Sequence, residues 1–220
     1  KYYPHIGDDG AFAGRDTLYA GARTTKNPGL EPSMFSFLIR LGRLTGDPAY
    51  FQTAWRDNGL SADALPRDLF AVDPEADALA VREAVKTHGD IPSAGSVNKE
   101  EWCLAFMRSG KGEHARGFWL DYDSGGRHSH SDCLNIGLYA KGLDLLPDFG
   151  YPPVQYGGWD SERAVWYRKA AAHNTVTVDS RDQKGGEPVK GRTTLWADGS
   201  MFRAVHASAP EVNDIRRFER

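Results

Sequence analysis

Apolar residues recur at helical spacing early in the chain. Within 32–44 they stand at positions 34, 37, 38, 41 and 44, which is the i, i+3, i+4, i+7 pattern of one helix face. Pro32 suits an early helical position, and the Gly46-Asp47-Pro48 turn ends the pattern. The sequence therefore predicts an amphipathic helix over these residues.

Two further helices are predicted after the first one. Asp47 is a good N-cap and Pro48 suits the first helical position, so a second helix starts here and stops at Asn58-Gly59. Residues 75–87 form a third, less regular helical pattern. Residues 1–90 are therefore expected to be a helical part of the molecule.

The pattern changes at about residue 91 to short runs with strand character, separated by glycine and aspartate turns. Short strands at this spacing are typical of an antiparallel sandwich rather than of a parallel sheet with crossover helices. Helices followed by strands predict an α+β, multidomain chain, with an antiparallel β-sandwich over 91–220. The predicted strands lie at 102–107, 117–122, 134–139, 173–178 and 194–196, the last leading to 201–205.

Composition narrows the class of protein. The 220 residues are 40% hydrophobic, which is enough for a packed core and excludes a wholly disordered chain. The formal net charge of -3 argues against a general nucleic-acid binder. No apolar run approaches the roughly 20 residues that span a bilayer. Two cysteines allow at most one disulfide and do not settle the redox compartment.

The two ends of the sequence do not resemble natural termini. It begins at Lys1 without a methionine or a signal-peptide pattern, and it stops at Arg220 inside a charged stretch. We therefore expect a piece of a larger protein.

Histidines and carboxylates provide the candidate chemistry. His128 and His130 alternate, so they project to one side if this stretch is extended. Asp148 follows His130 by 18 residues, and His173 follows Asp148 by 25. Two imidazoles and one carboxylate suit a zinc ion, with a fourth position left for water or another group. Solitary histidines are more often surface or hydrogen-bonded core residues, and this spacing is not one of the tight metal signatures.

Three segments together resemble the heparinase II/III-like polysaccharide lyases, which include heparin, heparan sulfate, alginate and oligoalginate lyases. The resemblance covers residues 90–180 well and the helical part loosely. It implies the last helices of an (α/α) toroid followed by a β-sandwich truncated at its C-terminus. The segments are Gly126-x-His128-x-His130-x-Asp132, Gly142-x4-Pro147-Asp148-x-Gly150 and His173-Asn174-Thr175-Val176.

The same resemblance implies roles for individual residues. His130, Asp148 and His173 match the zinc ligands of the family, and His128 matches an active-site histidine beside the metal. Another active-site tyrosine is implied between Asp148 and His173, where Tyr156 and Tyr167 both stand. The acid/base residues of the toroid find no match here and are expected upstream of Lys1. This chain alone is therefore expected to lack part of the active site.

The implied reaction is β-elimination on an acidic polysaccharide or oligosaccharide that contains uronic acid. Such a reaction removes the C5 proton and expels the O4 leaving group, with the neighbouring carboxylate neutralised. Arg163 and Arg168 are candidate contacts to the acidic sugar, and Trp159, in a glycine-rich loop, is a candidate stacking surface. A solvated face is the simpler interpretation for the arginines, and a core position is the simpler one for most of the tryptophans, among which Trp159 is the better sugar candidate. Such substrates imply a secreted or periplasmic protein, and the oligomeric state stays open.

Two other functions remain open from the sequence. The His128-x-His130-x-Asp132 segment also resembles the start of the metallo-β-lactamase-like zinc hydrolase signature, although Cys133 stands where that motif has histidine. The alternating strand and helix pattern of that fold is missing as well. The second alternative is a non-catalytic carbohydrate-binding module stabilised by zinc. The reaction product distinguishes these possibilities, since only a lyase creates a C4–C5 double bond.

Overall fold

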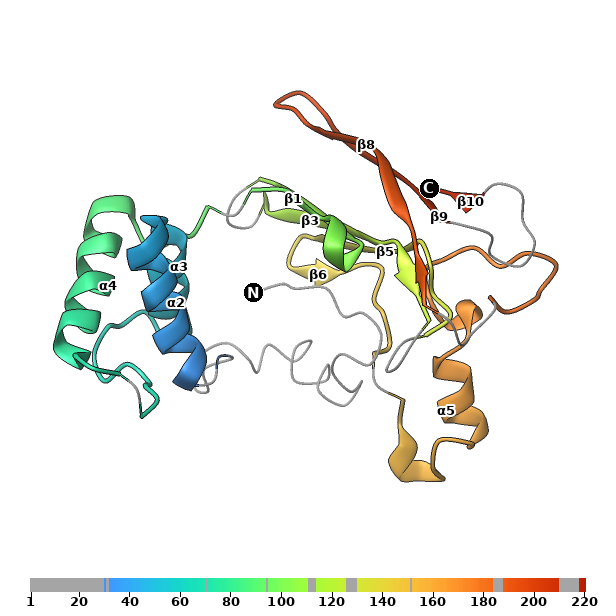
Figure 1. The fold of residues 1–220 in the computed structure, drawn as a ribbon, viewed down its shortest axis with the longest axis horizontal. Coiled ribbons are helices and arrows are strands. Elements are labelled where there is room, and N and C mark those ends of the chain that lie inside the picture. The colour runs from blue at the N-terminus through green and yellow to red at the C-terminus, as the bar shows by residue number, and fades with distance from the viewer. Residues whose placement is uncertain are drawn as a thin grey trace. The chain divides into compact units, whose positions relative to one another are not determined.

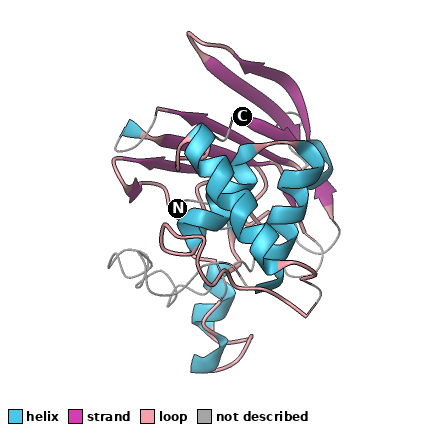
Figure 2. Cartoon of the chain, turned by 90° about the vertical axis from the view of Figure 1, so that its left-hand side faces the viewer, coloured by secondary structure: helices cyan, strands magenta, loops and turns pink. Residues whose placement is uncertain are grey.

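The computed structural model of the chain divides into two compact units, which meet in sequence near residue 94 (Figure 1). Its described residues contain four α-helices and ten β-strands. Helices make up the unit before Ala94, and strands dominate the unit from Gly95 onward (Figure 2). The described residues are 30, 32–69, 71–93, 95–110, 114–125, 130–150, 152–183, 188–209 and 218–220.

The three predicted helices are confirmed in the helical unit. They are α2 (Pro32–Thr45), α3 (Pro48–Asp57) and α4 (Pro74–His88). The Asp47 side chain caps α3 by accepting a hydrogen bond of 2.9 Å from the Ala49 N–H, and Asp73 caps α4 in the same way. Proline in the first turn and an aspartate cap thus begin both later helices, and the sequence predicts this start for α3.

Apolar side chains hold the helical unit together. Gly42 lets α3 approach α2 closely, because a Cβ at this position would stand 2.6 Å from the Phe51 ring. Phe35 and Val81 are completely buried. The buried cluster consists of Phe35, Ile39, Phe51, Ala54, Ala62 and Val81.

Antiparallel pairing is confirmed throughout the strand-rich unit. The largest sheet has the order β1-β2-β3-β5-β6, a second has β10-β9-β8, and a short one pairs β4 with β7. The first sheet contains β1 (Val97–Lys99), β2 (Leu104–Ser109), β3 (Arg116–Asp121), β5 (Asn135–Ala140) and β6 (Leu143–Asp144). The others contain β8 (Arg192–Asp198), β9 (Arg203–Ala209), β10 (Phe218–Glu219), β4 (Asp123–Ser124) and β7 (Val189–Lys190).

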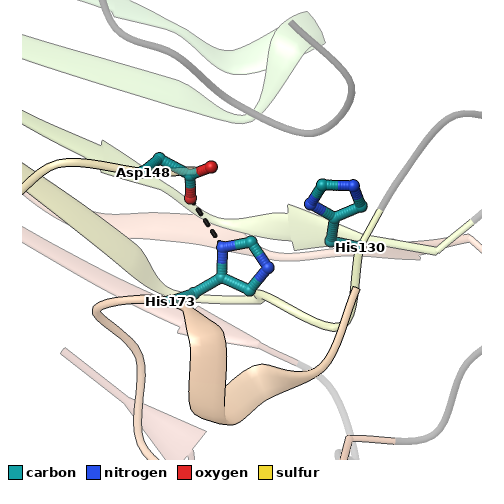
Figure 3. Close-up of side chains that lie close together, drawn as sticks. All are labelled: His130, Asp148 and His173. Carbon is teal, nitrogen blue, oxygen red and sulfur yellow. Dashed lines mark hydrogen bonds and ion pairs between the residues drawn. The ribbon is translucent and has the colours of Figure 1, made fainter. Parts of the chain in front are cut away.

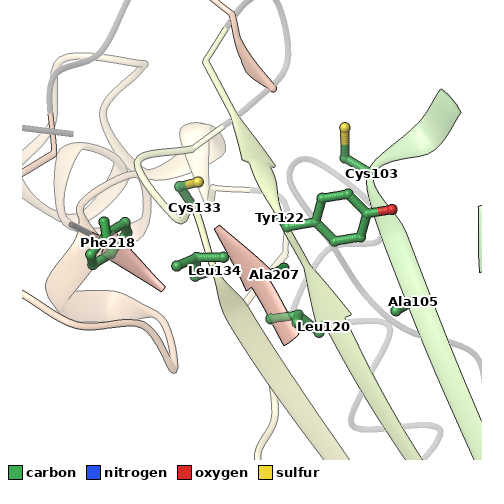
Figure 4. Packing of buried hydrophobic residues seen from close by; sticks show 8 residues of the cluster. All are labelled: Cys103, Ala105, Leu120, Tyr122, Cys133, Leu134, Ala207 and Phe218. Atoms are coloured by element: carbon green, nitrogen blue, oxygen red, sulfur yellow. The ribbon is translucent and has the colours of Figure 1, made fainter. Parts of the chain in front are cut away.

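One face of the main sheet forms the core of this unit. Ala105, Leu120 and Ile136 stand opposite one another on β2, β3 and β5. Ala207 of β9 and Phe218 of β10 belong to the same cluster (Figure 4). The cluster consists of Cys103, Ala105, Leu120, Tyr122, Cys133, Leu134, Ala207 and Phe218.

Both cysteines are buried free thiols. Burial raises the pKa of Cys103 to about 11 and that of Cys133 to about 12. Because a thiolate is the reactive form, these side chains act as small apolar groups in the core.

The main departure from the predicted elements lies around His173. The run 173–178 is not a strand: it follows the 3-10 helix η4 (Ala170–Ala172) and continues as irregular chain. Its polar groups do not form a backbone ladder with a neighbouring strand: the Asn174 N–H, for example, donates to the side-chain Oδ1 of Asn135 at 2.9 Å. The short helix α5 (Glu162–Tyr167), capped by Ser161, was not indicated by the apolar pattern.

No helix among the described residues is long and apolar enough to cross a membrane.

Candidate metal centre

Three chain segments converge on one buried point in the strand-rich unit (Figure 3). His130 precedes β5, Asp148 follows β6, and His173 follows η4. One potential ligand atom from each side chain lies within 4.8 Å of the other two. The structure therefore brings together the three residues for which the sequence predicts a shared metal.

Strand β5 and the hairpin that follows it determine where Asp148 lies. The chain reverses between β5 and β6, and the Leu145 N–H extends this hairpin by donating to the Leu138 carbonyl at 2.7 Å. Asp148 then accepts a 2.8 Å bond from the N–H of Gly150 through Oδ1. This local turn fixes the carboxylate beside the start of β5.

Asp148 and His173 form a buried pair. His173 Nδ1 lies 2.6 Å from Asp148 Oδ2, and both side chains are fully shielded from solvent. The same Oδ2 accepts a 2.8 Å hydrogen bond from Asn135 Nδ2. Since Nδ1 is engaged with Asp148, Nε2 is the remaining ring nitrogen of His173. That atom is buried and has no hydrogen-bond partner among the described residues.

The His130 ring lies beside this pair. Its centroid is 5.0 Å from that of His173, and the planes are tilted by 38°. His130 is 3% exposed. Two imidazoles at this separation, both out of solvent, can share an ion.

The contact between Asp148 and His173 shifts the pKa of both side chains. Burial raises the pKa of Asp148, but the hydrogen bond and the charge of His173 outweigh burial and bring it below its usual value. Burial lowers the pKa of His173, and the bond to Asp148 outweighs it in turn, so that pKa lies above its usual value. The carboxylate is therefore held in its ionised form, which is the form that binds a metal.

Two asparagines join the Asp148 and His173 segments. Asn135 donates to Asp148 and accepts from the N–H of Asn174. Asn174 Nδ2 donates to the carbonyl of Pro147 at 3.0 Å. Sequence reasoning did not assign Asn135 a role, although a polar residue in an otherwise apolar strand was a signal for one.

Two further buried carboxyls lie near the centre, since Asp132 interacts electrostatically with His173 and Asp148, and Asp121 interacts with Asp132. Burial raises the pKa of Asp132 to about 7 and that of Asp121 well above its usual value, with the Asp132 charge adding to the shift at Asp121. Asp121 and Asp132 are both less than 5% exposed. Burial therefore favours the protonated, neutral form of both carboxyls in the metal-free chain, whereas a nearby cation would favour their ionised form.

The donor set fits zinc. Imidazole nitrogen and carboxylate oxygen are zinc ligands, and three protein ligands with a fourth open position are typical of many zinc sites. His173 Nε2 is buried without a hydrogen-bond partner among the described residues, so its lone pair could bind an ion when Nδ1 carries the proton. A divalent ion would also balance the negative charge of Asp148, and the residues present fit the ion that the sequence implies.

The predicted catalytic histidine, His128, lies outside the described residues. Its neighbour His130 is in an irregular segment rather than a strand. The prediction that the two histidines share one face of a strand therefore stays a prediction.

The two candidate tyrosines have different surroundings. Tyr156 ends the 3-10 helix η3 (Val154–Tyr156) and is 67% exposed. Tyr167 ends α5, is 6% exposed, and packs against Phe149 with ring centroids 5.3 Å apart. Only Tyr156 presents most of its ring to solvent.

The predicted substrate residues lie on the same segment as Tyr156. The Arg163 guanidinium lies 5.7 Å from the centre of the Tyr156 ring, and that of Arg168 lies 5.7 Å from the centre of the Trp159 ring. Trp159 is 41% exposed. The Arg168 carbonyl accepts a 2.9 Å bond from the Ser131 N–H, which ties this segment to the chain beside His130.

Comparison with known proteins gives a match to one family model and a set of similar solved structures. Residues 120–220 match the family model described as heparinase II/III-like, C-terminal. No curated protein matches the chain.

Solved structures similar to the chain include lyases. Heparinase III, the BT4657 gene product, has 18% identity and a TM-score of 0.49, with 90% of this chain and 37% of that one covered. Heparan sulfate lyase HepC from Pedobacter heparinus has 16% identity and a TM-score of 0.47, with the same coverage. This chain thus spans 37% of the length of those two structures.

The family match includes all three residues of the centre and the asparagines that join them. Residues 120–220 are therefore the part of this chain that matches the heparinase II/III-like family model.

Proposed function

We propose that this chain is part of a polysaccharide lyase that cleaves uronic-acid-containing glycans by β-elimination, with a zinc ion beside the active site. The observation that carries the proposal is the convergence of His130, Asp148 and His173 inside a region that matches the heparinase II/III-like family. A buried centre of this kind, next to an exposed segment rich in aromatic and cationic side chains, suits recognition of an acidic sugar.

The reaction needs three functions from the protein. The carboxylate at C5 must be neutralised so that the C5 proton becomes acidic enough to remove. A base must then take that proton, and an acid must protonate O4 as the glycosidic bond breaks. The zinc ion, when bound, would hold the three segments in place and contribute positive charge near them.

His128 is our candidate for neutralising the carboxylate or moving a proton. It stands two residues before His130, so a fixed His130 limits where it can reach. An imidazole can do either task near neutral pH. We expect His128→Ala to abolish most of the elimination rate while zinc binding persists. A near-wild-type rate would remove His128 from the mechanism.

Tyr156 and Tyr167 are both proposed as contacts to the reacting sugar, and their different burial separates them. The exposed Tyr156 ring is accessible to a glycan, whereas the Tyr167 ring is packed between Phe149 and Trp166. We expect Tyr156→Phe to lower the rate without changing stability. Tyr167→Phe tests the other assignment by the same measurement.

Trp159, Arg163 and Arg168 are proposed to bind the substrate. Trp159 offers an accessible aromatic face for a sugar ring, and guanidinium groups pair well with carboxylates and sulfates. Arg168 is anchored by a 2.9 Å bond from Nη2 to the Trp159 carbonyl, and its Nε is buried without a hydrogen-bond partner among the described residues. We expect Trp159→Ala to raise KM more than it lowers kcat.

The test is a panel of alginate, heparan sulfate, chondroitin, hyaluronan and ulvan, followed by ultraviolet absorbance of the unsaturated product. It requires the complete natural gene product, because this chain spans about a third of the similar solved structures. Unsaturated product on one of these glycans supports the lyase. Cleavage without a double bond indicates a hydrolase, and binding without turnover indicates a carbohydrate-binding module; either result contradicts the proposal. Secretion or a periplasmic location is part of the same proposal.

A further inference from the structure

A pair of consecutive residues, Asp182 and Gln183, contacts two of the three segments that form the metal centre. Gln183 reaches the segment of His130, and Asp182 reaches the segment of His173. Neither residue belongs to the motifs that indicated the site, and neither is a metal ligand.

A tight turn brings the pair back to the centre. The chain passes His173, reaches Val178 and reverses at Asp179 and Ser180, whose φ angles are 54° and 55°. Two consecutive positive φ values are the mark of a type I′ turn, and the Arg181 N–H donates to the Val178 carbonyl at 3.0 Å. Residues after the turn therefore run beside the segment that they have just left.

Gln183 binds the backbone of Cys133 at two points. Its Oε1 accepts a 2.9 Å bond from the Cys133 N–H, and its Nε2 donates to the Cys133 carbonyl at 3.2 Å. Gln183 is 4% exposed. The amide thus satisfies a backbone donor and acceptor as a neighbouring strand would. A carboxylate lacks the donor for this arrangement, and an apolar side chain lacks both groups.

Thr175 reinforces the same contact. Its hydroxyl donates to the Cys133 carbonyl at 2.5 Å, and it accepts from Gln183 Nε2 at 3.3 Å. Cys133 follows His130 by three residues, and Thr175 follows His173 by two. The histidine segments are therefore joined close to their ligand residues.

Asp182 fixes the approach to His173. Its Oδ1 accepts a 2.7 Å hydrogen bond from the N–H of Ala170, the first residue of η4. His173 ends that turn, and its own N–H donates to the Ala170 carbonyl at 3.1 Å. The start of η4, and with it the direction of His173, depends on this carboxylate.

We propose that Asp182 and Gln183 act as a clamp that holds the His130 and His173 segments at the separation that metal binding requires. Both are positioning residues. The inference rests on the proposed metal centre and adds to it the residues that set its affinity. Outer partners of metal ligands typically change metal affinity by about 10–100-fold when they are removed.

The test measures zinc affinity of the folded chain by competition with a chromophoric chelator, and thermal unfolding without metal. We expect Gln183→Met, which keeps the shape and loses the hydrogen bonds, to weaken zinc binding at least about tenfold. Asp182→Ala should weaken it as well. Asp182→Asn should restore it, because an amide oxygen still accepts from Ala170. The visible absorption of bound cobalt should change in Gln183→Met.

Tyr122→Phe is the matched control. The Tyr122 hydroxyl donates a 2.9 Å bond to Asn98 in the same unit, and Asn98 is neither a proposed metal ligand nor part of the clamp. Loss of this bond should lower the melting temperature and leave zinc affinity unchanged. If Gln183→Met does not fold, Asp182→Ala and Asp182→Asn test the clamp in its place, because Asp182 is an exposed residue.

The results distinguish a failure of the clamp from a failure of the metal centre. Variants of Asp182 and Gln183 that melt earlier but bind zinc like the wild type would overturn the clamp and leave the metal centre intact. A wild-type chain that binds no zinc would overturn the centre and the clamp together.

Discussion

The helical unit and the metal centre are stabilised in opposite ways. In the helical unit, apolar residues at regular helical spacing meet in a core around Phe35 and Val81, and the ion pairs lie at the surface. In the metal centre, buried polar groups from distant parts of the chain bond to one another, as Asp148 does with Asn135 and His173. The first depends on periodicity, and the second on individual hydrogen bonds.

This difference determines what a substitution does. Shortening an apolar side chain leaves a cavity whose cost depends on the volume removed. Removing one member of a buried polar network leaves its partners without hydrogen bonds in a medium of low dielectric. The centre should therefore lose function before fold, and the helical unit should lose fold without affecting the centre.

Asp148→Ala should have the largest effect. It removes a proposed metal ligand and leaves His173, Asn135 and the Gly150 N–H without their common acceptor. Breaking a buried ion pair costs about 3–5 kcal/mol. Zinc affinity should fall more than about 100-fold, beyond the usual effect of an outer partner. Calorimetry measures the loss of stability, and chelator competition measures the zinc affinity. An Asp148→Ala chain with unchanged zinc affinity would contradict the ligand assignment.

Phe35→Ala is the counterpart in the helical unit. Phe35 is fully buried in the core formed by α2, α3 and α4, so its loss should cost about 3–5 kcal/mol of unfolding free energy. Zinc affinity should stay unchanged, because none of the ligand residues lies in this unit. Denaturant unfolding measures the stability of the variant, and zinc competition measures its affinity for the metal. A fall in zinc affinity would show that the helical unit and the metal centre are not independent.

Asn135→Ala should have an intermediate effect on both quantities. The Asp148 carboxylate and the Asn174 N–H each lose a buried partner, at a cost of about 1–3 kcal/mol. Asp148 is also less well oriented, so zinc should bind about tenfold more weakly. Asn135→Asp is a useful second variant, because it still accepts from Asn174 but adds negative charge beside Asp148. A change in stability alone would make Asn135 a purely structural residue.

The same contrast between the helical unit and the metal centre explains which features the sequence predicts. Spacing of apolar residues located α2, and an aspartate followed by proline located the start of α3. The residue types of His130, Asp148 and His173, together with the resemblance to the heparinase II/III-like lyases, indicated a shared metal, and the structure brings the three side chains together. The role of Gln183 was not predicted, because its neighbours in the sequence do not indicate that it bonds to Cys133, fifty residues away. The run at 173–178 looked like a strand because its threonines and valines favour strands, but tertiary hydrogen bonds overrode that preference.

Asp121 predicts a pH dependence of the metal-free chain. Burial raises its pKa in the folded state above the unfolded value of about 4. Its stabilising contribution is therefore complete below pH 4 and disappears as the pH rises through the folded pKa, by up to about 1.4 kcal/mol for each pH unit. Asp121→Asn should flatten this decline. Melting temperatures measured with chelator from pH 4 to 8 test it, and equal slopes for both chains would contradict the assignment.

Arg43→Gln should have the smallest effect. Arg43 forms an ion pair of 2.8 Å with Asp77, and its side chain is 47% exposed. Exposed pairs contribute at most about 1 kcal/mol, and salt reduces that further. A change in melting temperature of more than a few degrees would show that α2 and α4 depend on charge more than their apolar contacts indicate.

The most direct measurement of the central claim is a crystal structure of the zinc-loaded chain with anomalous diffraction at the zinc absorption edge. We expect one strong anomalous peak per chain, coordinated by side-chain atoms of His130, Asp148 and His173. Absence of a peak at these three residues in crystals grown with zinc, or a peak held by other side chains, would contradict it.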